Sequence, residues 1–457
     1  MQKNKQLVVL DVVGLSVSLL GENTPNINRY IAQNEVSPMG EVFPAVTTTA
    51  QASMLTGVQP QHHGIVGNGW YERDFAEVMF WKQSNKLVQG DKVWDHLKSA
   101  DPAFKCSKLF WWYNMYANVD NSITPRPHYP ADGRKIIDLY STPNGLHQSI
   151  ESEIGQFPFF NFWGPKAGIQ SSQWIAKAAM IEFSKNQPNL QLVYLPHLDY
   201  CLQKVGPSDP SVAIELQAID AVVGELIDFY QAAGADVAIV SEYGMNEVSQ
   251  PIHINRILRE AGYITIRDSL TWEMLDPGAC KAFAVADHQV AHVYINDASL
   301  KQQVKTLLSQ TAGIAQVLDA DEKQQFNVDH ERAGDLIVIA EPDRWFTYYY
   351  WLDDKKAPDF ASTVDIHRKP GYDPAEMFVD PKLTLPMARV IWRLIQKKLG
   401  FRMLMDVIPL QADMIKGSHG RLAQSPEEGA LVILPAALMR KNINMPDIAD
   451  IIKQYYV

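Results

Sequence analysis

The sequence is poor in cysteine and in long apolar runs, and both shortages narrow what the chain can be. Its three cysteines, Cys106, Cys201 and Cys280, are odd in number and widely spaced, unlike a disulfide framework. We therefore expect them to be reduced. No segment approaches the ~18–20 apolar residues of a membrane span. The N-terminal apolar run is broken by Asp11 and is too short for a signal peptide. We expect a cytoplasmic protein with no membrane partner.

Basic residues are also outnumbered, with 41 Lys and Arg against 52 Asp and Glu and a net charge of −11. Nucleic acid polymers are held mainly by Lys and Arg, so this balance disfavours them as partners. A small phosphorylated substrate is still compatible with it, because a bound metal can reverse the local field. The oligomeric state is not indicated by the sequence.

Apolar runs and amphipathic segments alternate along the chain of 457 residues. Strand-like runs occur at 7–10, 192–195, 236–241, 335–340 and 430–434, and residues 212–232 have helical spacing. This alternation predicts an α/β fold with a mostly parallel sheet covered by helices on both faces.

Two regions interrupt this alternation. Residues 104–165 and 270–395 are dense in aromatic residues and prolines. We expect a core formed by residues 1–268 and 396–457, with residues 269–395 inserted as a smaller lid domain. Most of the aromatic side chains are expected to fill cores, while a minority could stack on a base or an aryl leaving group.

The segment FPAVTTTAQASMLTG, residues 43–57, is the candidate site of nucleophilic chemistry. Thr48 and Gln51 have the spacing of a capping box, and Gly57 suits a helix C-terminus. Thr47 is then expected just before the helix, where free N–H groups and the helix dipole can hold a phosphate. Its hydroxyl could attack phosphorus if a metal lowered its pKa. The alternative is that the three threonines only cap a helix.

This segment and the following QPQHHGIVGN, residues 59–68, resemble the nucleotide pyrophosphatase/phosphodiesterase family of the alkaline phosphatase superfamily. The family carries FPTxTFPNHYS…TG followed by YPxxHGIxxN. The resemblance implies an alkaline phosphatase-like three-layer α/β/α sandwich, with Thr47 as nucleophile and His63 in a structural role. It also implies two divalent metals, usually zinc, on seven positions.

Four of those positions hold suitable residues. Asp11 ends the first strand, Thr47 is the nucleophile, Asp199 matches the family's PDxxGHxxGP motif, and His419 lies in a GSHG turn. The resemblance implies one metal at Asp11 and Glu242 and another at Asp199 and His419. Since Ala50 replaces the family's phosphate-binding Asn, backbone N–H groups of Thr48 or Thr49 would have to bind phosphate.

Three ligand positions depart from the family. Gln203 and Tyr243 replace histidines and Glu242 replaces an aspartate. Gln and Tyr are weak zinc ligands, and the oxygen-rich set could favour Mn or Mg. Candidates that could compensate as ligands are His197, Asp287, His288, His292, Asp365 and His367, although such residues are more often part of a solvated turn or an ion-pair cluster. Arg368 and Lys369 could contact an anionic substrate, and an ordinary basic surface turn is an equal alternative.

The favoured function is metal-dependent hydrolysis of a phosphodiester or pyrophosphate bond in a small phosphorylated substrate. A phosphonate or phosphate monoester is an alternative substrate. The altered ligands also motivate a second hypothesis of another class, a catalytically degenerate binding module with the same fold.

Overall fold

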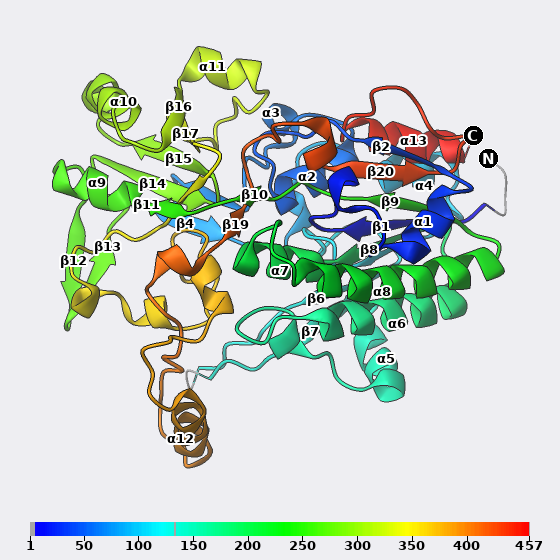
Figure 1. The fold of residues 1–457 in the computed structure, drawn as a ribbon, viewed down its shortest axis with the longest axis horizontal. Helices are drawn as coiled ribbons and strands as arrows, with labels where there is room; N and C mark the ends of the chain where they lie inside the picture. Colours follow the sequence, from blue (N-terminus) through cyan, green and yellow to red (C-terminus); the bar gives the residue numbers. More distant parts are fainter. Residues whose placement is uncertain (1–4, 132–133, 457) are drawn as a thin grey trace.

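The computed structural model describes residues 5–131 and 134–456, and its centre is an eight-stranded sheet (Figure 1). Its order is β2 (Glu35–Pro38), β20 (Leu431–Leu434), β9 (Asp236–Val240), β1 (Leu7–Val12), β8 (Leu190–Leu195), β5 (Cys106–Leu109), β6 (Asn121–Pro125) and β7 (Leu139–Thr142). The strands from β9 to β6 are parallel, whereas β2, β20 and β7 add antiparallel edges. The mostly parallel sheet is confirmed.

Helices cover both faces of this sheet and complete the three layers (Figure 1). One face carries α1 (Pro25–Ile31), α6 (Ile169–Asn186), α7 (His197–Val205) and α8 (Val212–Ala232). The other carries α2 (Thr47–Thr56), α4 (Val93–Ala100) and α13 (Asp447–Tyr455). The helix α8 has the bounds that apolar spacing predicted. Because both faces are covered, the central strands are apolar on both sides.

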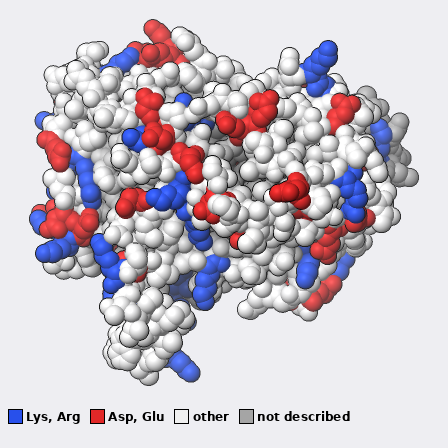
Figure 2. Space-filling view, viewed as in Figure 1, with Lys and Arg blue, Asp and Glu red and all other residues white. Residues whose placement is uncertain are grey.

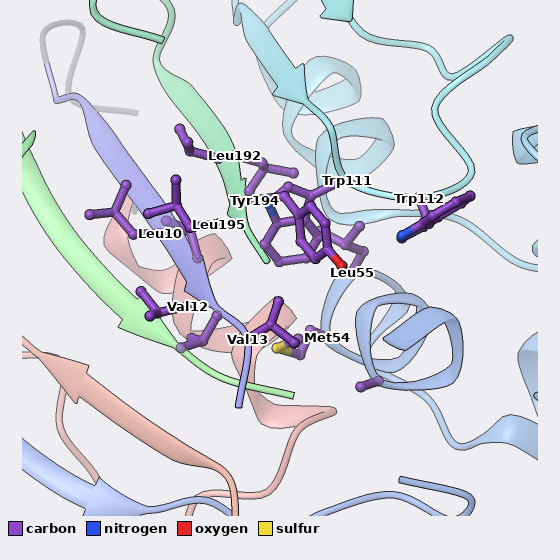
Figure 3. Packing of buried hydrophobic residues seen from close by; sticks show 14 of the residues in the cluster. Leu10, Val12, Val13, Met54, Leu55, Trp111, Trp112, Leu192, Tyr194 and Leu195 are labelled. Carbon is purple, nitrogen blue, oxygen red and sulfur yellow. The ribbon is translucent and has the colours of Figure 1, made fainter. Parts of the chain in front are cut away.

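A buried layer of aliphatic and aromatic side chains joins the central strands to α2 (Figure 3). Leu10 of β1 and Leu192 and Leu195 of β8 are fully buried. Figure 3 shows the neighbouring Trp111 and Trp112 pointing to different sides of the chain, Trp111 toward this layer and Trp112 away from it. The core therefore packs the central strands against the last turn of α2, through Met54 and Leu55.

A second, antiparallel sheet has the order β14 (Ala282–Asp287), β15 (Val290–Ile295), β17 (Leu336–Ala340) and β16 (Ile314–Leu318). The predicted strand at 335–340 is therefore real, but it belongs to this sheet. Its apolar core runs from Val248 to Ile415, beyond both ends of the segment 269–395. The domain boundaries stay a prediction, since a shared core does not define a folding unit.

The remaining elements are short. They are the helices α3 (Pro60–His63), α5 (Leu146–Ile154), α9 (Ile254–Glu260), α10 (Lys301–Ser309), α11 (Ala320–Gln325) and α12 (Pro386–Lys398), and the strand pairs β3 (Gly69–Glu72) with β4 (Glu77–Phe80), β10 (Asn246–Glu247) with β19 (Gly417–Ser418), β11 (Gln250–Ile252) with β18 (Arg344–Phe346), and β12 (Ile266–Ser269) with β13 (Trp272–Leu275). The three cysteines are unpaired, as predicted.

A lysine is buried in the central sheet and should make stability depend on pH. Lys108 of β5 is fully buried and donates hydrogen bonds to the carbonyl oxygens of Trp112 and Tyr113, at 2.7 and 3.0 Å. Burial lowers its pKa from 10.5 to about 7. Between these values the unfolded chain binds the proton more tightly than the folded one, so Lys108 makes the free energy of unfolding rise with pH.

We therefore expect Lys108→Met to flatten the rise in unfolding free energy from about pH 7 to about pH 10. Denaturant titrations at a series of pH values measure it. Lys105→Met, at an exposed position just before the same strand, is the control and should leave the slope unchanged. An unaltered slope in the Lys108 variant would contradict the assignment.

Candidate active site

Side chains from distant parts of the chain meet beyond the carboxyl ends of β1, β8 and β9, where ligands of open α/β sheets bind. Asp11 is the penultimate residue of β1, Glu242 lies two residues after β9, and Asp199 lies in the first turn of α7, which follows β8. Thr47 opens α2 and His419 follows β19. All five are buried, and none is more than 7% exposed.

Gln51 bridges the two carboxyl groups on one side of this cluster. Its Nε2 donates to Asp11 Oδ2 at 3.1 Å and to Glu242 Oε1 at 2.7 Å. Its Oε1 accepts a hydrogen bond of 2.7 Å from the Trp112 N–H, which fixes the orientation of the amide. The side chain of Gln51 is thus engaged in the site, so the capping box predicted for Thr48 and Gln51 is wrong. The helix begins at Thr47, its N-cap is Val46, and Gly57 ends it with φ of 75°.

Tyr243 connects the candidate nucleophile to the other carboxyl group. Its hydroxyl oxygen lies 3.1 Å from Thr47 Oγ1, and it donates to Asp199 Oδ1 at 3.2 Å. Burial holds the pKa of Tyr243 well above its ordinary value, so the phenol keeps its proton. With that proton directed to Asp199, the Tyr243 oxygen is free to accept from the Thr47 hydroxyl, which also lies within hydrogen-bond reach of Glu242.

Asp199 and Gln203 lie one turn apart on α7 and contact each other directly. Gln203 Nε2 donates to Asp199 Oδ2 at 2.7 Å. The Tyr372 hydroxyl donates to Gln203 Oε1 at 2.8 Å, which sets the amide with its nitrogen toward the carboxylate. Gln203 therefore presents a donor, rather than a ligand oxygen, to Asp199.

Four aromatic rings form a column beside these groups. The rings of Tyr243 and His419 are 3.5 Å apart, those of His419 and His288 3.8 Å, and those of His288 and Tyr372 3.6 Å, measured between centroids. His419 Nδ1 lies 2.8 Å from the Ala45 carbonyl oxygen, and burial lowers the pKa of His419 well below its ordinary value. The neutral ring thus carries its proton on Nδ1 and its lone pair on Nε2, which lies 3.8 Å from Asp199 Oδ1.

A second network ties α2 to the antiparallel sheet. The Thr48 N–H donates to Asn68 Oδ1 at 3.1 Å, and the Asn68 N–H and Nδ2 donate to the two oxygens of Asp287 at 2.8 and 3.1 Å. The Thr48 hydroxyl donates to the Gly67 carbonyl at 2.8 Å. The Thr48 N–H is therefore occupied and does not fit the phosphate-binding role expected for it. That role for Thr49 stays a prediction.

Other sequence candidates point elsewhere. His197 Nε2 lies 2.8 Å from Glu215 of α8, and His292 Nε2 2.9 Å from the Val66 carbonyl oxygen. Arg368 pairs with Asp365 at 3.2 Å and is largely exposed. The electrostatic neighbours of His367 include Lys135 and Asp365, outside the networks around Thr47. Their interactions thus argue against ligand roles for His197 and His367 and give Arg368 no link to Thr47. His63 accepts a hydrogen bond of 3.1 Å from the Ile65 N–H, in keeping with a structural role.

The buried carboxyl groups are energetically unfavourable as anions. Burial raises the pKa of Asp11 to about 7, that of Asp199 to about 7, and that of Glu242 well above its ordinary value. The mutual repulsion of Asp11 and Glu242 contributes to the raised pKa of Glu242. A cluster of this kind is neutral through bound protons or is compensated by a cation.

The donor set fits one cation better than two. The carboxyl groups of Asp11 and Glu242 are close enough to share a proton, and Asp11 Oδ1 and Glu242 Oε2 accept no hydrogen bond from an N–H donor, so a cation that prefers oxygen ligands could replace that proton. By contrast, both oxygens of Asp199 already accept hydrogen bonds. Among the described residues, no three His, Cys, Asp or Glu side chains are arranged as a ready metal site. This applies to one cation as much as to two, so the number and identity of the metal ions stay a prediction.

Several members of the site were not identified from the sequence. Gln51 was assigned to a cap, although its position four residues after Thr47 places both on one face of α2. Asn68 ends the QPQHHGIVGN segment that resembles the family, but neither it nor Tyr372 was singled out as a site residue. Trp112 and Trp163, from the aromatic runs, lie near the site. The ring centroid of Trp81 is 4.7 Å from that of Trp112 and 6.1 Å from that of Tyr372, and the Trp163 and Tyr372 centroids are 5.9 Å apart. Stacking of a substrate on any of them stays a prediction.

Comparison with known proteins identifies the fold. Over 99% of this chain, the structure is similar to murine ectonucleotide pyrophosphatase/phosphodiesterase 5 in complex with AMP, with a TM-score of 0.58, 15% identity and 94% of that chain covered. It is also similar to phosphonoacetate hydrolase of Sinorhizobium meliloti in complex with phosphonoacetate, with a TM-score of 0.62, 14% identity, and 99% and 96% of the two chains covered. The alkaline phosphatase-like fold is thus confirmed.

Sequence comparison identifies the family. An uncharacterised pyrophosphatase/phosphodiesterase of Schizosaccharomyces pombe is 23% identical over 253 residues, which cover 53% of this chain and 45% of that protein. Ectonucleotide pyrophosphatase/phosphodiesterase family member 1 of Rattus norvegicus is 22% identical over 238 residues, covering 50% and 22%. The chain thus matches less than half the length of either relative. Residues 7–373 match the type I phosphodiesterase/nucleotide pyrophosphatase family, and the chain belongs to that family.

Proposed function

We propose that this protein hydrolyses a phosphodiester or pyrophosphate bond in a small substrate, with Thr47 as the nucleophile. Membership of a family of phosphodiesterases and pyrophosphatases supports the reaction class. The observation that carries the residue assignment is the hydrogen-bonded chain from Thr47 through Tyr243 to Asp199. A buried hydroxyl at the start of a helix, with a route for its proton, is suited to attack on phosphorus.

In this mechanism the Thr47 proton passes to the Tyr243 oxygen while the Tyr243 proton passes to Asp199. The Thr47 oxygen forms a bond to phosphorus, and the bond between phosphorus and the leaving oxygen breaks. Water then hydrolyses the phosphorylated threonine and restores the hydroxyl. Tyr243 acts as a relay and Asp199 as the final proton acceptor, which is the work of a general base.

Asp11 Oδ1 and Glu242 Oε2 would hold a divalent cation, and Mg or Mn suits such a set better than zinc. When bound, the cation supplies charge that stabilises the phosphoryl oxygens. Gln51 orients both carboxyl groups by donating to one oxygen of each. The Trp112 N–H, in turn, holds the Gln51 amide in place.

The cation can be tested without activity. We expect the wild-type protein to bind close to one Mn²⁺ per chain in a titration monitored by the paramagnetic signal of free Mn²⁺. Asp11→Asn should lose most of this affinity, because it removes the charge while keeping the shape. Asp228→Asn, which alters an exposed carboxylate paired with Arg29, is the control. Equal binding by the wild type and the Asp11 variant would place the cation elsewhere.

The relay can be tested by removing one oxygen. Tyr243→Phe should lower kcat by roughly 10²- to 10⁴-fold with little change in KM, because proton transfer is lost while the ring remains in the aromatic column. Tyr349→Phe is the matched control, since the Tyr349 hydroxyl is buried without a hydrogen-bond partner and lies in the second core. An unchanged kcat in Tyr243→Phe would exclude the relay.

The substrate class is decided by a panel that contains an aryl phosphodiester, a nucleoside triphosphate, a phosphate monoester and phosphonoacetate, each assayed with Mg²⁺, Mn²⁺ or Zn²⁺. Preferential cleavage of the diester or the triphosphate supports the proposal. Preferential cleavage of the phosphonate would favour the alternative suggested by the similar phosphonoacetate hydrolase. Binding without turnover would favour a catalytically degenerate binding module, an alternative motivated by the Gln51 amide lying between two carboxyl groups.

A further inference from the structure

One helix projects from the body of the protein and carries its apolar side chains outward. The helix α12 lies at the lower tip of the molecule and is connected to the body by two long irregular segments (Figure 1). We define the arm as residues 382–405, which include α12 and its flanks. None of the residues of α12 is buried. Near its root, Leu383, Val390 and Met405 pack on a small cluster formed by Ala375, Val407 and Ile408.

The two faces of α12 are reversed relative to an ordinary surface helix, which turns its apolar side inward. Arg389 and Arg393, on the polar side, both pair with Asp406 of the returning segment. The apolar side is left open. Its exposed members, with their flanks, are Leu385, Met387, Ile391, Trp392, Leu394, Ile395, Leu399, Phe401 and Leu404, between 41% and 70% exposed. In Figure 2 the arm is almost entirely uncharged surface with a basic tip. An apolar surface of this extent indicates a partner.

The charge of the arm indicates which partner. The arm contains six basic residues and no acidic one, in a chain whose net charge is −11. Lys397, Lys398 and Arg402 are exposed beside the apolar side chains. Exposed Trp, Leu and Phe next to Lys and Arg are the composition of helices that lie in the plane of a bilayer and contact anionic headgroups.

Two other arrangements fit less well. A second copy would bring together two arms of like charge, each with six basic residues and no acidic one, and their mutual repulsion disfavours that contact. Insertion across the bilayer is also disfavoured, because the described part of the chain contains no helix that is long and apolar enough to span it.

We propose that the arm docks this protein on a membrane surface rich in anionic phospholipid, with α12 parallel to the bilayer and its apolar side chains among the headgroups and upper acyl chains. Arg389 and Arg393 stay paired with Asp406 on the protein side of the helix, and Lys397, Lys398 and Arg402 contact the lipid phosphates. The sequence predicted no membrane partner because neither a spanning segment nor a signal peptide is recognisable in it, and a helix that lies on the bilayer surface requires neither. This proposal does not depend on the proposed catalytic activity.

Vesicle co-sedimentation tests it. The full-length protein should bind vesicles that contain phosphatidylglycerol at least about tenfold more tightly than vesicles of phosphatidylcholine alone, with binding weakened by salt. Ile391→Ser/Leu394→Ser should abolish binding, and Lys397→Glu/Lys398→Glu should weaken it by about tenfold or more. Leu270→Ser is the matched control, because Leu270 is an apolar side chain 88% exposed outside the arm.

Each result is decisive when the same samples are also examined by light scattering. Binding to anionic vesicles that both arm variants lose and the control retains supports the proposal. Failure of the folded wild-type protein to bind either vesicle overturns it. A dimer in solution that Ile391→Ser/Leu394→Ser converts to a monomer, with equal vesicle binding by both, would show that a second copy covers the arm and would also overturn it.

Discussion

Thr47→Ala is expected to lower turnover of the preferred substrate by on the order of 10³-fold or more, because the attacking oxygen is lost. Substrate affinity should change little. The fold should persist, because the side chain of Thr47 does not cap α2. The substitution removes the hydrogen bond between the Thr47 and Tyr243 hydroxyl groups. Single-turnover kinetics, with the thermal midpoint recorded for each sample, measure both effects.

The matched control for this prediction is Thr56→Ala, at the other end of α2. Its hydroxyl donates to the Ala52 carbonyl oxygen at 2.7 Å and takes no part in the networks around Thr47. It should retain nearly full activity. If Thr47→Ala kept wild-type turnover while remaining folded, the nucleophile would have to be another group, and the relay through Tyr243 would lose its purpose.

The largest expected effect on stability comes from a buried ion cluster behind Tyr372. Lys369 Nζ lies 2.7 Å from both Asp373 Oδ2 and Glu376 Oε1, and the three side chains are 0–2% exposed. Trp163 Nε1 donates to the second oxygen of Glu376 at 2.6 Å. Lys369→Met would leave two buried carboxyl groups without their cation, and we expect it to lower the free energy of unfolding by about 3–5 kcal/mol.

Lys305→Met is the matched control, because Lys305 also pairs with two carboxylates, Asp319 at 2.6 Å and Glu322 at 3.2 Å, but on the surface. It should cost at most about 1 kcal/mol. Urea titrations measure both variants. Equal losses would mean that burial does not set the strength of these pairs.

The pH dependence of the Lys369→Met variant gives an independent check. Burial already raises the pKa of Glu376 in the wild-type protein, and removing the lysine should raise it further. A carboxyl whose pKa is higher in the folded state binds its proton more tightly there, so acidification stabilises that state. The difference in unfolding free energy between the wild type and the variant should therefore narrow as pH falls from about 7 toward about 5. A deficit independent of pH would indicate lost packing instead of uncompensated charge.

Local patterns were enough to predict the architecture and the location of the candidate site. The apolar runs at 7–10, 192–195 and 236–241 correspond to β1, β8 and β9, and α8 has its predicted bounds. These elements are specified by short-range periodicity and by burial on both faces, which can be recognised in one sequence. For the same reason Asp11 and Glu242 could be assigned to one edge of the sheet, since parallel strands end together there. Asp199 and the role of Thr47 as nucleophile were instead implied by the resemblance to the family's motifs.

Strand direction and side-chain partners depended on long-range contacts that no local pattern encodes. The runs at 335–340 and 430–434 were recognisable as strands, but only pairing shows that one joins a second sheet and the other is antiparallel. Gln51 contacts Asp11 and Glu242 across 40 and 191 residues, and Tyr372 contacts Gln203 across 169. A polar side chain acquires its role from whichever donor or acceptor the packed core brings within about 3 Å, and that neighbour is set by the tertiary fold.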